Sequence, residues 1–477
     1  MFDYRAFALG KLVAIAPRYL PFADVATDEM PLSRLLRLSL FQVTVGMALV
    51  LLVGTLNRVM IVELAVPATL VAGMLAMPLL FAPFRTLIGF RSDTHRSALG
   101  LRRLPYIWKG TLYQFGGFAI MPFALLVLSG YAEAIDAPRW IGLSSAALAF
   151  LLVGAGVHMV QTVGLALATD LVREEDQPKV VGLMYVMLLV GMVVSALIYG
   201  ALLETYTPGR LIQVIQGSAV VTVALNLFAM WKQEPRDRVR ARAMEAAPKV
   251  RFQDAWARLL AIPGTRRLLV AIGLGTFGFG MADVLLEPYG GQALGFSVAE
   301  TTKLTALLAG GTLLGFGIAS RALGAGGNPA RLAAIGAMIG IPGFLAIVLS
   351  ASMIGPGLFI AGTLATGLGA GLFGHATLTA AIRGAPRDQI GLTLGAWGAV
   401  QATCAGIGVA LAGVVRDVLV SLPALSGLAV HVPYNVVFTA EMAFLAAAIL
   451  VVIPLSARRG RPRGDLSAPH TPSVEVP

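Results

Sequence analysis

Runs of about 20 consecutive apolar residues recur along this chain, and each is long enough to cross the hydrocarbon core of a bilayer as a helix. The other spanning structure, a closed β-barrel, would show short strands of alternating hydrophobicity, which this sequence does not have. Only 13% of the residues are charged, whereas soluble domains carry about 25%. The sequence therefore predicts an all-α polytopic membrane protein.

The apolar runs predict twelve transmembrane helices in two groups of six. The longest polar interruption, 232–267, separates an N-terminal bundle, 35–231, from a C-terminal bundle, 268–456. Residues 1–34 and 457–477 are expected to be a cytoplasmic N-terminal segment and a disordered cytoplasmic tail. The predicted spans are 35–56, 66–84, 107–129, 141–168, 180–203, 211–231, 268–286, 301–320, 331–350, 356–382, 390–414 and 435–455.

Basic residues are distributed unevenly between the two sides of the predicted bundle. With the N-terminus in the cytoplasm, the inner segments hold 31 of the 36 Lys and Arg residues. The outer loops hold the other five, Arg58, Arg139, Arg210, Lys303 and Arg416. An excess of basic residues marks cytoplasmic loops. We therefore predict that both termini are cytoplasmic and that the basic surface faces anionic lipid headgroups rather than nucleic acid.

The linker contains the segment RFQDAWARLLAIPG, whose spacing predicts a short helix. Phe252, Trp256, Leu259 and Leu260 fall on one face of that helix. Such an amphipathic helix can lie in the cytoplasmic membrane interface. The alternative is a short connector packed on the inner mouth of the bundle.

The two halves carry related sequences around a membrane histidine. GAGVHMVQTVGLALATD begins at Gly154 and GAGLFGHATLTAA begins at Gly369. Each opens with GAG and contains one histidine, His158 on span four and His375 on span ten. An Asp-Gln pair follows in the next inner loop of each half. These equivalent positions indicate an internal repeat.

Helical spacing gives each histidine polar neighbours in the cytoplasmic third of the bilayer. Gln161 and Thr162 lie beside His158, and Thr379 lies beside His375. A neutral imidazole can bind a metal while a neighbour orients its second nitrogen. Since neither helix has a further ligand at suitable spacing, one imidazole fits a metal held by a macrocycle, as in haem. The alternative is an interhelical hydrogen bond that stabilises the bundle.

Three acidic residues fall in or directly beside the predicted spans, toward their outer ends: Asp283, Glu287 and Glu441. Intramembrane acids suggest proton coupling, and the alternatives are structural pairing and solvation at the interface. No Lys or Arg is expected in the middle of a span, which disfavours transport of anionic substrates. No arrangement of a nucleophile and a base indicates an enzyme.

The inner loop after span two, GFRSDTHRSALGLRR, resembles the signature of the major facilitator superfamily. The residues in the matching roles are Gly89, Asp93, Gly100, Arg102 and Arg103, with a longer gap than usual between Asp93 and Gly100. Longer strings, including LRRLPYIWKGTLYQFGGF, HMVQTVGLALATDL, DVLLEPYGG and GLFGHATLTAA, resemble the PucC/LhaA proteins of purple phototrophic bacteria. These form the bacteriochlorophyll-delivery branch of that superfamily, and the likeness covers residues 20–455.

The resemblance implies a major-facilitator fold and a role in assembling light-harvesting complexes in the intracytoplasmic part of the bacterial inner membrane. Bacteriochlorophyll, or a phytylated or geranylgeranylated precursor, would bind transiently and pass to the antenna α and β polypeptides. Further implied partners are the reaction centre–light-harvesting 1 complex, pigment-synthesis and membrane-insertion proteins, and membrane lipids. We favour the core antenna as the client.

On this reading, His158 and His375 are the expected axial ligands of the pigment magnesium, and Gln161, Thr162 and Thr379 orient them. Further residues are expected to line the cavity or receive antenna helices: Phe41, Gln42, Tyr106, Trp108, Tyr113, Gln114 and Phe115. Two other functions stay open. One is a scaffold that holds antenna helices without binding pigment. The other is a proton-coupled or passive transporter of an apolar or neutral solute, using Asp283 or Glu441.

Overall fold

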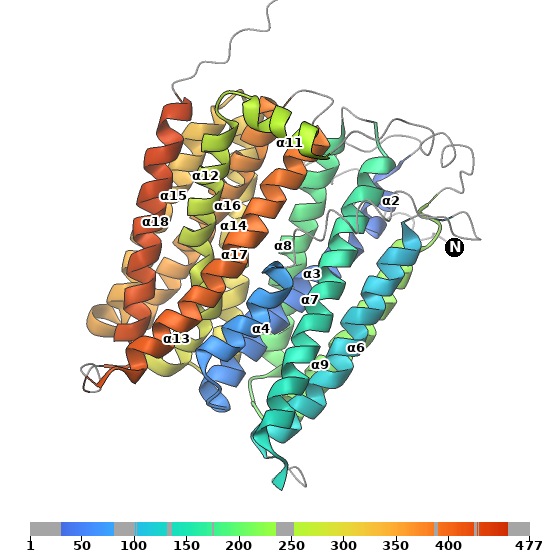
Figure 1. The fold of residues 1–477 in the computed structure, drawn as a ribbon. Helices are drawn as coiled ribbons and strands as arrows, with labels where there is room; N and C mark the ends of the chain where they lie inside the picture. The colour runs from blue at the N-terminus through green and yellow to red at the C-terminus, as the bar shows by residue number, and fades with distance from the viewer. Residues whose placement is uncertain are drawn as a thin grey trace, which may run out of the picture.

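The computed structural model describes residues 30–80, 101, 103–130, 136–173, 176–234, 252–385, 390–423, 427 and 429–456. All regular structure in these ranges is helical, and the long helices run between two ends of one bundle (Figure 1). Eleven are long and apolar enough to cross a membrane, and a shorter apolar helix, α4 (Ala68–Leu80), occupies the position of the second span. The predicted all-α polytopic fold is confirmed.

The N-terminal half begins with one continuous helix from Leu32 to Glu63. It consists of α2 (Leu32–Leu38), α3 (Leu40–Leu49) and two π-helical segments, η2 (Val50–Leu56) and η3 (Val59–Glu63). After α4 the half continues with α6 (Leu104–Ser129), α7 (Arg139–Asp170), α8 (Gln177–Leu202) and α9 (Pro208–Met230).

The length of the first helix corrects one sequence-based expectation. The predicted span ended at residue 56, which left Arg58 in an outer loop. The helix instead continues to Glu63, so Arg58 lies inside a membrane helix and is 3% exposed. The apolar run alone did not reveal this, because a buried arginine near a helix end looks like a loop charge when its partners are unknown.

The C-terminal half contains the remaining six spans. The seventh is interrupted and consists of α12 (Thr265–Gly280), the 3₁₀ turn η6 (Met281–Val284) and α13 (Leu286–Leu294). It is followed by α14 (Val298–Gly324), α15 (Pro329–Leu349) with η7 (Ser350–Ile354), α16 (Pro356–Gly384), α17 (Ile390–Ser421) and α18 (Val432–Ser456).

Side chains from two other helices satisfy the backbone at the interruption of the seventh span. The N–H of Ala282 donates to Oε1 of Glu441 on α18 at 2.6 Å. The carbonyl of Val284 accepts from Nδ2 of Asn57, in the first helix, at 2.9 Å. Irregular backbone at membrane depth requires such partners, because lipid provides none. The interruption is thus stabilised from both halves of the protein.

Glycines allow α14 and α16 to pack backbone against backbone. A Cβ atom built on Gly371 would lie 2.1 Å from the carbonyl oxygen of Thr312, and one on Gly315 would lie 2.2 Å from that of Leu368. Both distances are far below van der Waals contact. Small residues at four-residue spacing permit this close approach in membrane bundles.

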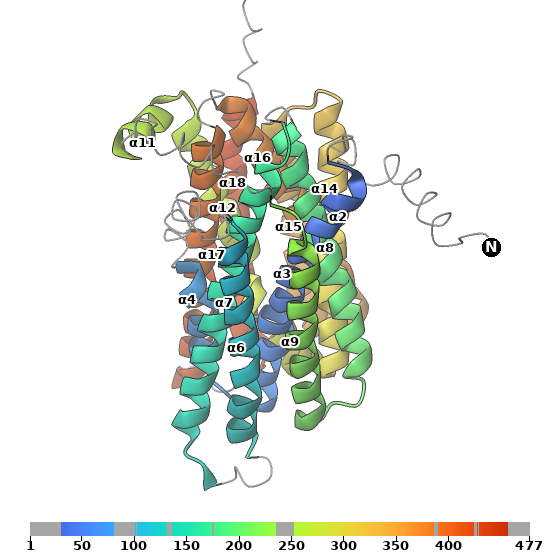
Figure 2. The ribbon, with the colours of Figure 1, turned by 90° about the vertical axis from the view of Figure 1, so that its right-hand side faces the viewer.

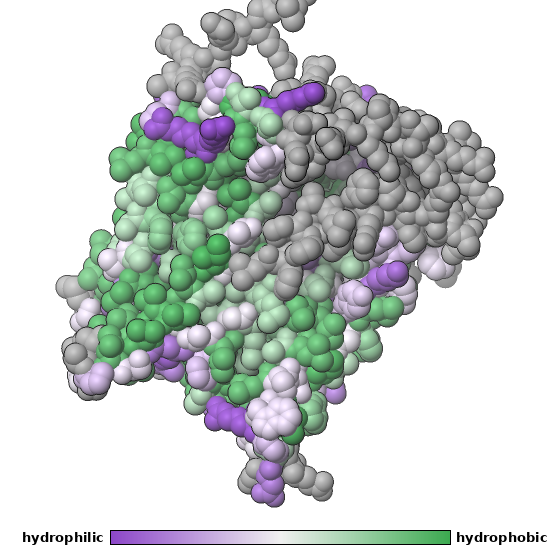
Figure 3. Space-filling view, viewed as in Figure 1, coloured by the Kyte–Doolittle hydropathy of each residue, from purple (hydrophilic) through white to green (hydrophobic). Residues whose placement is uncertain are grey.

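The predicted linker helix is present as α11 (Phe252–Ala261), at the same end of the bundle as the start of α12 (Figures 1 and 2). Leu259 is 1% exposed and lines a cavity formed by the inner ends of the C-terminal helices. This packing agrees with a connector seated on the inner mouth. The space-filling view shows apolar side chains covering the middle of the described surface, with hydrophilic ones near its two ends (Figure 3).

The inner-loop signature is only partly visible. Gly89, Asp93, Gly100 and Arg102 lie outside the described residues. Arg103 begins α6, and its guanidinium pairs with the carboxylate of Asp170 at 3.1 Å, at the end of α7. Its backbone N–H donates to Glu234, just beyond α9, at 3.0 Å. Arg103 therefore ties together the inner ends of three helices of the N-terminal half.

Candidate functional site: a central cavity between the two halves

A cavity of ≈ 440 Å³ lies between the two halves. This volume is within the range of about 300–1,000 Å³ that accommodates drug-sized ligands. Its walls are mostly apolar, and no Lys or Arg is among the lining residues that the structure describes. The polar residues that line it are His158, Gln161, Tyr185, Thr276, Asp283, Thr312, Thr366, Thr377, Trp397 and Gln401.

The two halves meet on the outer side of this cavity. On α17, Gly413 packs against Ala68 and Ala72 of α4, whereas the cavity residues of α17 begin at Ala405 and continue inward. On α8, Gly200 packs against Lys303 of α14, whereas the cavity residues of these helices lie deeper. The cavity is therefore closed toward the predicted outer face.

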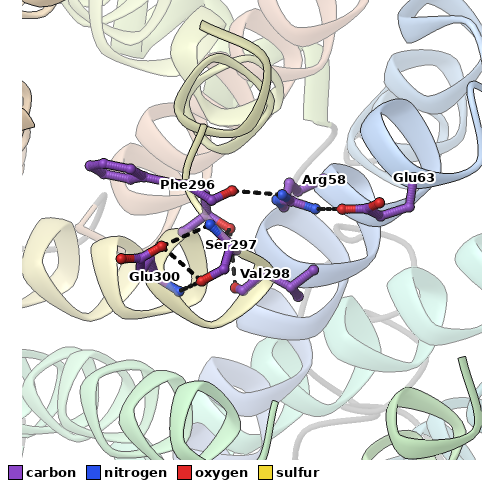
Figure 4. A network of polar contacts seen from close by, with 7 residues as sticks. Arg58, Glu63, Phe296, Ser297, Val298 and Glu300 are labelled. Carbon is purple, nitrogen blue, oxygen red and sulfur yellow. Dashed lines mark hydrogen bonds and ion pairs between the residues drawn. The ribbon is translucent and has the colours of Figure 1, made fainter. Parts of the chain in front are cut away.

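Arg58 makes the central polar contact of this outer closure (Figure 4). Its guanidinium pairs with Glu63 on the same helix and donates through Nη2 to the carbonyl of Phe296 at 2.8 Å. Phe296 belongs to the C-terminal half, immediately before the capping box that Ser297 and Glu300 form at the start of α14. One buried arginine therefore joins the end of the first helix to the α13–α14 connection.

Tyr206, in the connection between α8 and α9, lies close to the same charges. Burial and the neighbouring Glu63 carboxylate raise the pKa of its phenol to about 12. The phenol is therefore neutral at physiological pH and adds no negative charge beside Glu63.

The structure places His158 and Gln161 together on the cavity wall. Both project from α7, one turn apart, as the sequence spacing predicted. Thr162, the other expected neighbour, is half-buried and is not among the lining residues. The imidazole of His158 thus forms part of the cavity wall, and Gln161 is a polar side chain beside it on the same helix.

The structure does not bring His375 to this cavity. Gly374 and Thr377 of α16 line it, and a helix turns by about 100° per residue, so His375 points away from it. Its ring packs on Phe316 of α14 at 4.1 Å between centroids, and its side chain is 8% exposed. Thr379 is not among the lining residues either. The two sequence-equivalent histidines therefore occupy different environments.

The three acidic residues also occupy different environments. Asp283, in η6, is exposed to the cavity although helices surround it. Glu287 is 3% exposed and accepts a hydrogen bond from Thr305, while Glu441 is fully buried at the helix interruption. Glu287 and Glu441 thus accept hydrogen bonds inside the bundle, whereas Asp283 faces the cavity.

Sequence reasoning missed several lining residues. Trp397 and Gln401 lie one turn apart on α17, and Nε1 of Trp397 donates to Oγ1 of Thr377 at 3.4 Å. A tryptophan and a glutamine at four-residue spacing in an otherwise small-residue span were a usable signal. Thr377 was overlooked in favour of Thr379, because one histidine position does not reveal which face of its helix meets the cavity.

The aromatic and amide residues of spans one and three that were expected to line the cavity or receive antenna helices lie outside the central cavity. Phe41 is buried against Gly164, and Gln42 and Gln114 are fully buried within the N-terminal half. Tyr113 and Phe115 are exposed on α6, 44% and 39% respectively, where they face the membrane. The seven residues proposed from the sequence are all absent from the described lining of the central cavity: Phe41, Gln42, Tyr106, Trp108, Tyr113, Gln114 and Phe115.

The cavity combines an apolar wall, one imidazole, several neutral hydrogen-bonding groups and one carboxylate. A charged organic anion would find no cation among the described lining residues. A flat, largely apolar molecule with an open metal coordination site and peripheral carbonyl groups matches what the walls offer. The donor set thus fits a metal-bearing macrocycle bound through a single imidazole.

Comparison with known proteins gives strong matches along the chain. A family model described as PUCC protein matches residues 55–460. Protein PucC of Rhodobacter capsulatus is 71% identical over 460 residues, which cover 96% of this chain and all of that protein. Protein PucC of Rhodovulum sulfidophilum is 64% identical over 411 residues, which cover 86% and 90% of the two chains.

Solved structures match the fold at much lower sequence identity. The crystal structure of a bacterial homologue of the human lysosomal transporter Spinster superposes with a TM-score of 0.60 at 16% identity. The match covers 92% of this chain and 96% of that one. This likeness is one of fold, and the solved structures of this kind are transporters of the major facilitator type.

Proposed function

The chain belongs to the PucC family, and from that membership we propose that it is an assembly factor for a bacterial light-harvesting antenna. It would bind bacteriochlorophyll, or a precursor with an isoprenoid tail, and deliver it to the antenna α and β polypeptides in the photosynthetic membrane. The observation that carries the pigment-binding part of the proposal is the imidazole of His158 on the wall of a cavity without described cations.

In this proposal His158 holds the pigment. Bound bacteriochlorophyll would supply a magnesium ion that takes one further ligand, and the imidazole of His158 would donate a nitrogen lone pair to it. Gln161, one turn along α7, is placed to orient the ring or to donate to a carbonyl of the pigment. Gln401 provides a further donor on the opposite half, where the indole N–H of Trp397 is bonded to Thr377.

The cavity walls explain how an apolar pigment would be accepted and an anionic solute refused. A charged group inside the membrane needs a counter-charge, and the described lining offers one carboxylate and no cation. An apolar macrocycle needs only contact with apolar side chains and a few neutral donors. His375 has no part in this scheme, because it packs against Phe316 away from the cavity.

The proposal is tested by purifying the tagged protein in mild detergent from pigmented cells. We expect bacteriochlorophyll in its absorption spectrum and antenna polypeptides among the co-purifying proteins. Antenna polypeptides without pigment would instead support a scaffold. The absence of both pigment and antenna polypeptides would contradict the proposal.

A deletion strain identifies the client antenna. We expect the strain to contain less of an assembled antenna complex, while the amounts of the enzymes that synthesise bacteriochlorophyll stay unchanged. The core and peripheral antennas are quantified separately by their absorption bands, which tests the preference for the core antenna. Unchanged levels of both antennas would contradict the proposed role.

A second candidate function is proton-coupled transport of a neutral solute, and the position of Asp283 in the cavity favours it. An acid exposed inside a membrane cavity is a usual site of proton uptake. The test is solute-driven proton movement in proteoliposomes, which Asp283→Asn would abolish. If Asp283→Asn leaves antenna assembly unchanged and no proton movement is measured, this candidate is excluded.

A further inference from the structure

A second cavity, of ≈ 490 Å³, opens on the membrane-facing surface of the N-terminal half. It is a groove between α8 and α9, which touch each other little and both pack on α3. The three helices are labelled in Figure 2. Val43 and Met47 of α3 form its floor, and exposed side chains such as Ile198 and Val221 form its rims. It is separate from the central cavity, with which it shares no lining residue.

The shape of this groove suits one extended chain. Its residues on α9 run from Arg210 to Leu225, a rise of about 22 Å. The groove is therefore long enough for a hydrocarbon chain that lies along α9.

The outer end of the groove carries a positive charge. Arg210 lies in the first turn of α9, and its Nε donates to the carbonyl of Leu202 at the end of α8 at 3.1 Å. This bond fixes the guanidinium, while neither of its Nη groups makes a hydrogen bond to a described residue. The partial positive charge at the start of α9 adds to that of Arg210. An anionic group with several oxygens, such as a phosphodiester, complements this end.

The remaining walls are mostly apolar, and their polar groups are Ser195, Gln213 and one hydroxyl pair. Tyr199 and Ser218 bond to each other at 2.7 Å, so they require no polar group from a ligand. Beside them, Gly217 leaves the groove open, since no atom lies within 4 Å of a Cβ atom built there. A hydrocarbon chain can therefore pass this point in contact with the helix backbone.

We propose that this groove is a binding site for a phospholipid of the outer leaflet, with one acyl chain between α8 and α9 and the phosphate at Arg210. Charge complementarity decides the occupant. The isoprenoid tail of a pigment would fit the channel but carries no anionic group for Arg210. The lipid would hold α8 and α9 at their present separation.

The experiment uses vesicles that contain phosphatidylglycerol with a photoreactive group in one acyl chain. We expect adducts on the peptides that carry residues 194–202 and 213–225. Arg210→Gln should lower their yield about fivefold, since a basic residue near the headgroups contributes about 1 kcal/mol. Gly217→Leu should remove them, because Gly217 lines the groove and a Cβ atom there has no atom within 4 Å, so the leucine side chain would occupy the path of the acyl chain.

Two matched variants serve as controls. Arg139→Gln removes another outer arginine, which bonds to the carbonyls of Leu64 and Ala65 away from the groove. Gly317→Leu adds the same side chain at a glycine on α14 that also has no atom within 4 Å of its Cβ position. Both should leave the adducts unchanged. Adducts spread evenly over all lipid-facing helices, or equal yields in Gly217→Leu and Gly317→Leu, would overturn the proposal. Stronger labelling of these peptides by an uncharged photoreactive isoprenoid than by the phospholipid would also overturn the proposal.

Discussion

The carboxylate of Glu441 on α18 accepts a 2.6 Å hydrogen bond from the backbone N–H of Ala282, where the seventh span is interrupted. Glu441→Gln keeps an acceptor oxygen of the same reach, so we expect it to preserve the thermal stability of the purified protein. Glu441→Leu leaves a buried N–H without a partner, which costs about 1–3 kcal/mol. Thermal unfolding in detergent should show a lower midpoint for the leucine variant only, and equal losses in both would contradict this account.

The close packing of α14 against α16 predicts that alanine substitutions at two glycines of α16 have very different effects on stability. Gly371→Ala would drive a methyl group into the carbonyl of Thr312, whereas Gly374→Ala meets no atom within 4 Å. Overpacking of this kind costs about 1–3 kcal/mol. We expect Gly371→Ala to lower the unfolding midpoint and Gly374→Ala to leave it unchanged. Similar midpoints for the two variants would show that the helices are further apart.

Arg58 is expected to keep the cavity closed toward the outer face. Arg58→Gln removes its ion pair with Glu63 and weakens its bond to Phe296. A charged hydrogen bond contributes about 2 kcal/mol, which corresponds to a roughly 30-fold change in the ratio of closed to open molecules. A cysteine introduced at Gln401, in a Cys404→Ser background, should then react faster with an impermeant maleimide added from the outer side.

The control for that experiment is Arg139→Gln. This residue is also an outer arginine, but both of its bonds, to Leu64 and Ala65, stay within the N-terminal half. Its loss should leave the labelling rate unchanged. If the cysteine is labelled at the same rate in Arg58→Gln, in Arg139→Gln and in the protein without either change, Arg58 does not control the closure.

The fold was accessible from sequence because apolar run length determines which segments cross a bilayer. The positions of polar residues around each helix were harder to predict. Spacing correctly placed Gln161 with His158, since one turn of α7 joins them. Spacing could not orient His375, because the face that α16 presents to the cavity depends on how closely Gly371 lets α14 approach.

The environments of the acidic residues and of Arg58 were also not predictable from the sequence. A sequence shows that Glu441 lies in a span, but not that a helix interruption on another span supplies its donor. Likewise, Arg58 looked like a loop residue because its partners come from Glu63 and from the distant Phe296. In both cases the missing information was a long-range contact. The break after Gly280 also had no clear sign in an apolar, glycine-rich run.

The central claim is that His158, and not His375, holds the pigment in the cavity between the two halves. The most direct measurement is the amount of bacteriochlorophyll per polypeptide in His158→Leu and His375→Leu, each purified from pigmented cells and checked for an unchanged thermal midpoint. The account predicts that His158→Leu loses the pigment and that His375→Leu retains it. Full pigment in folded His158→Leu, or loss only in His375→Leu, would contradict the account.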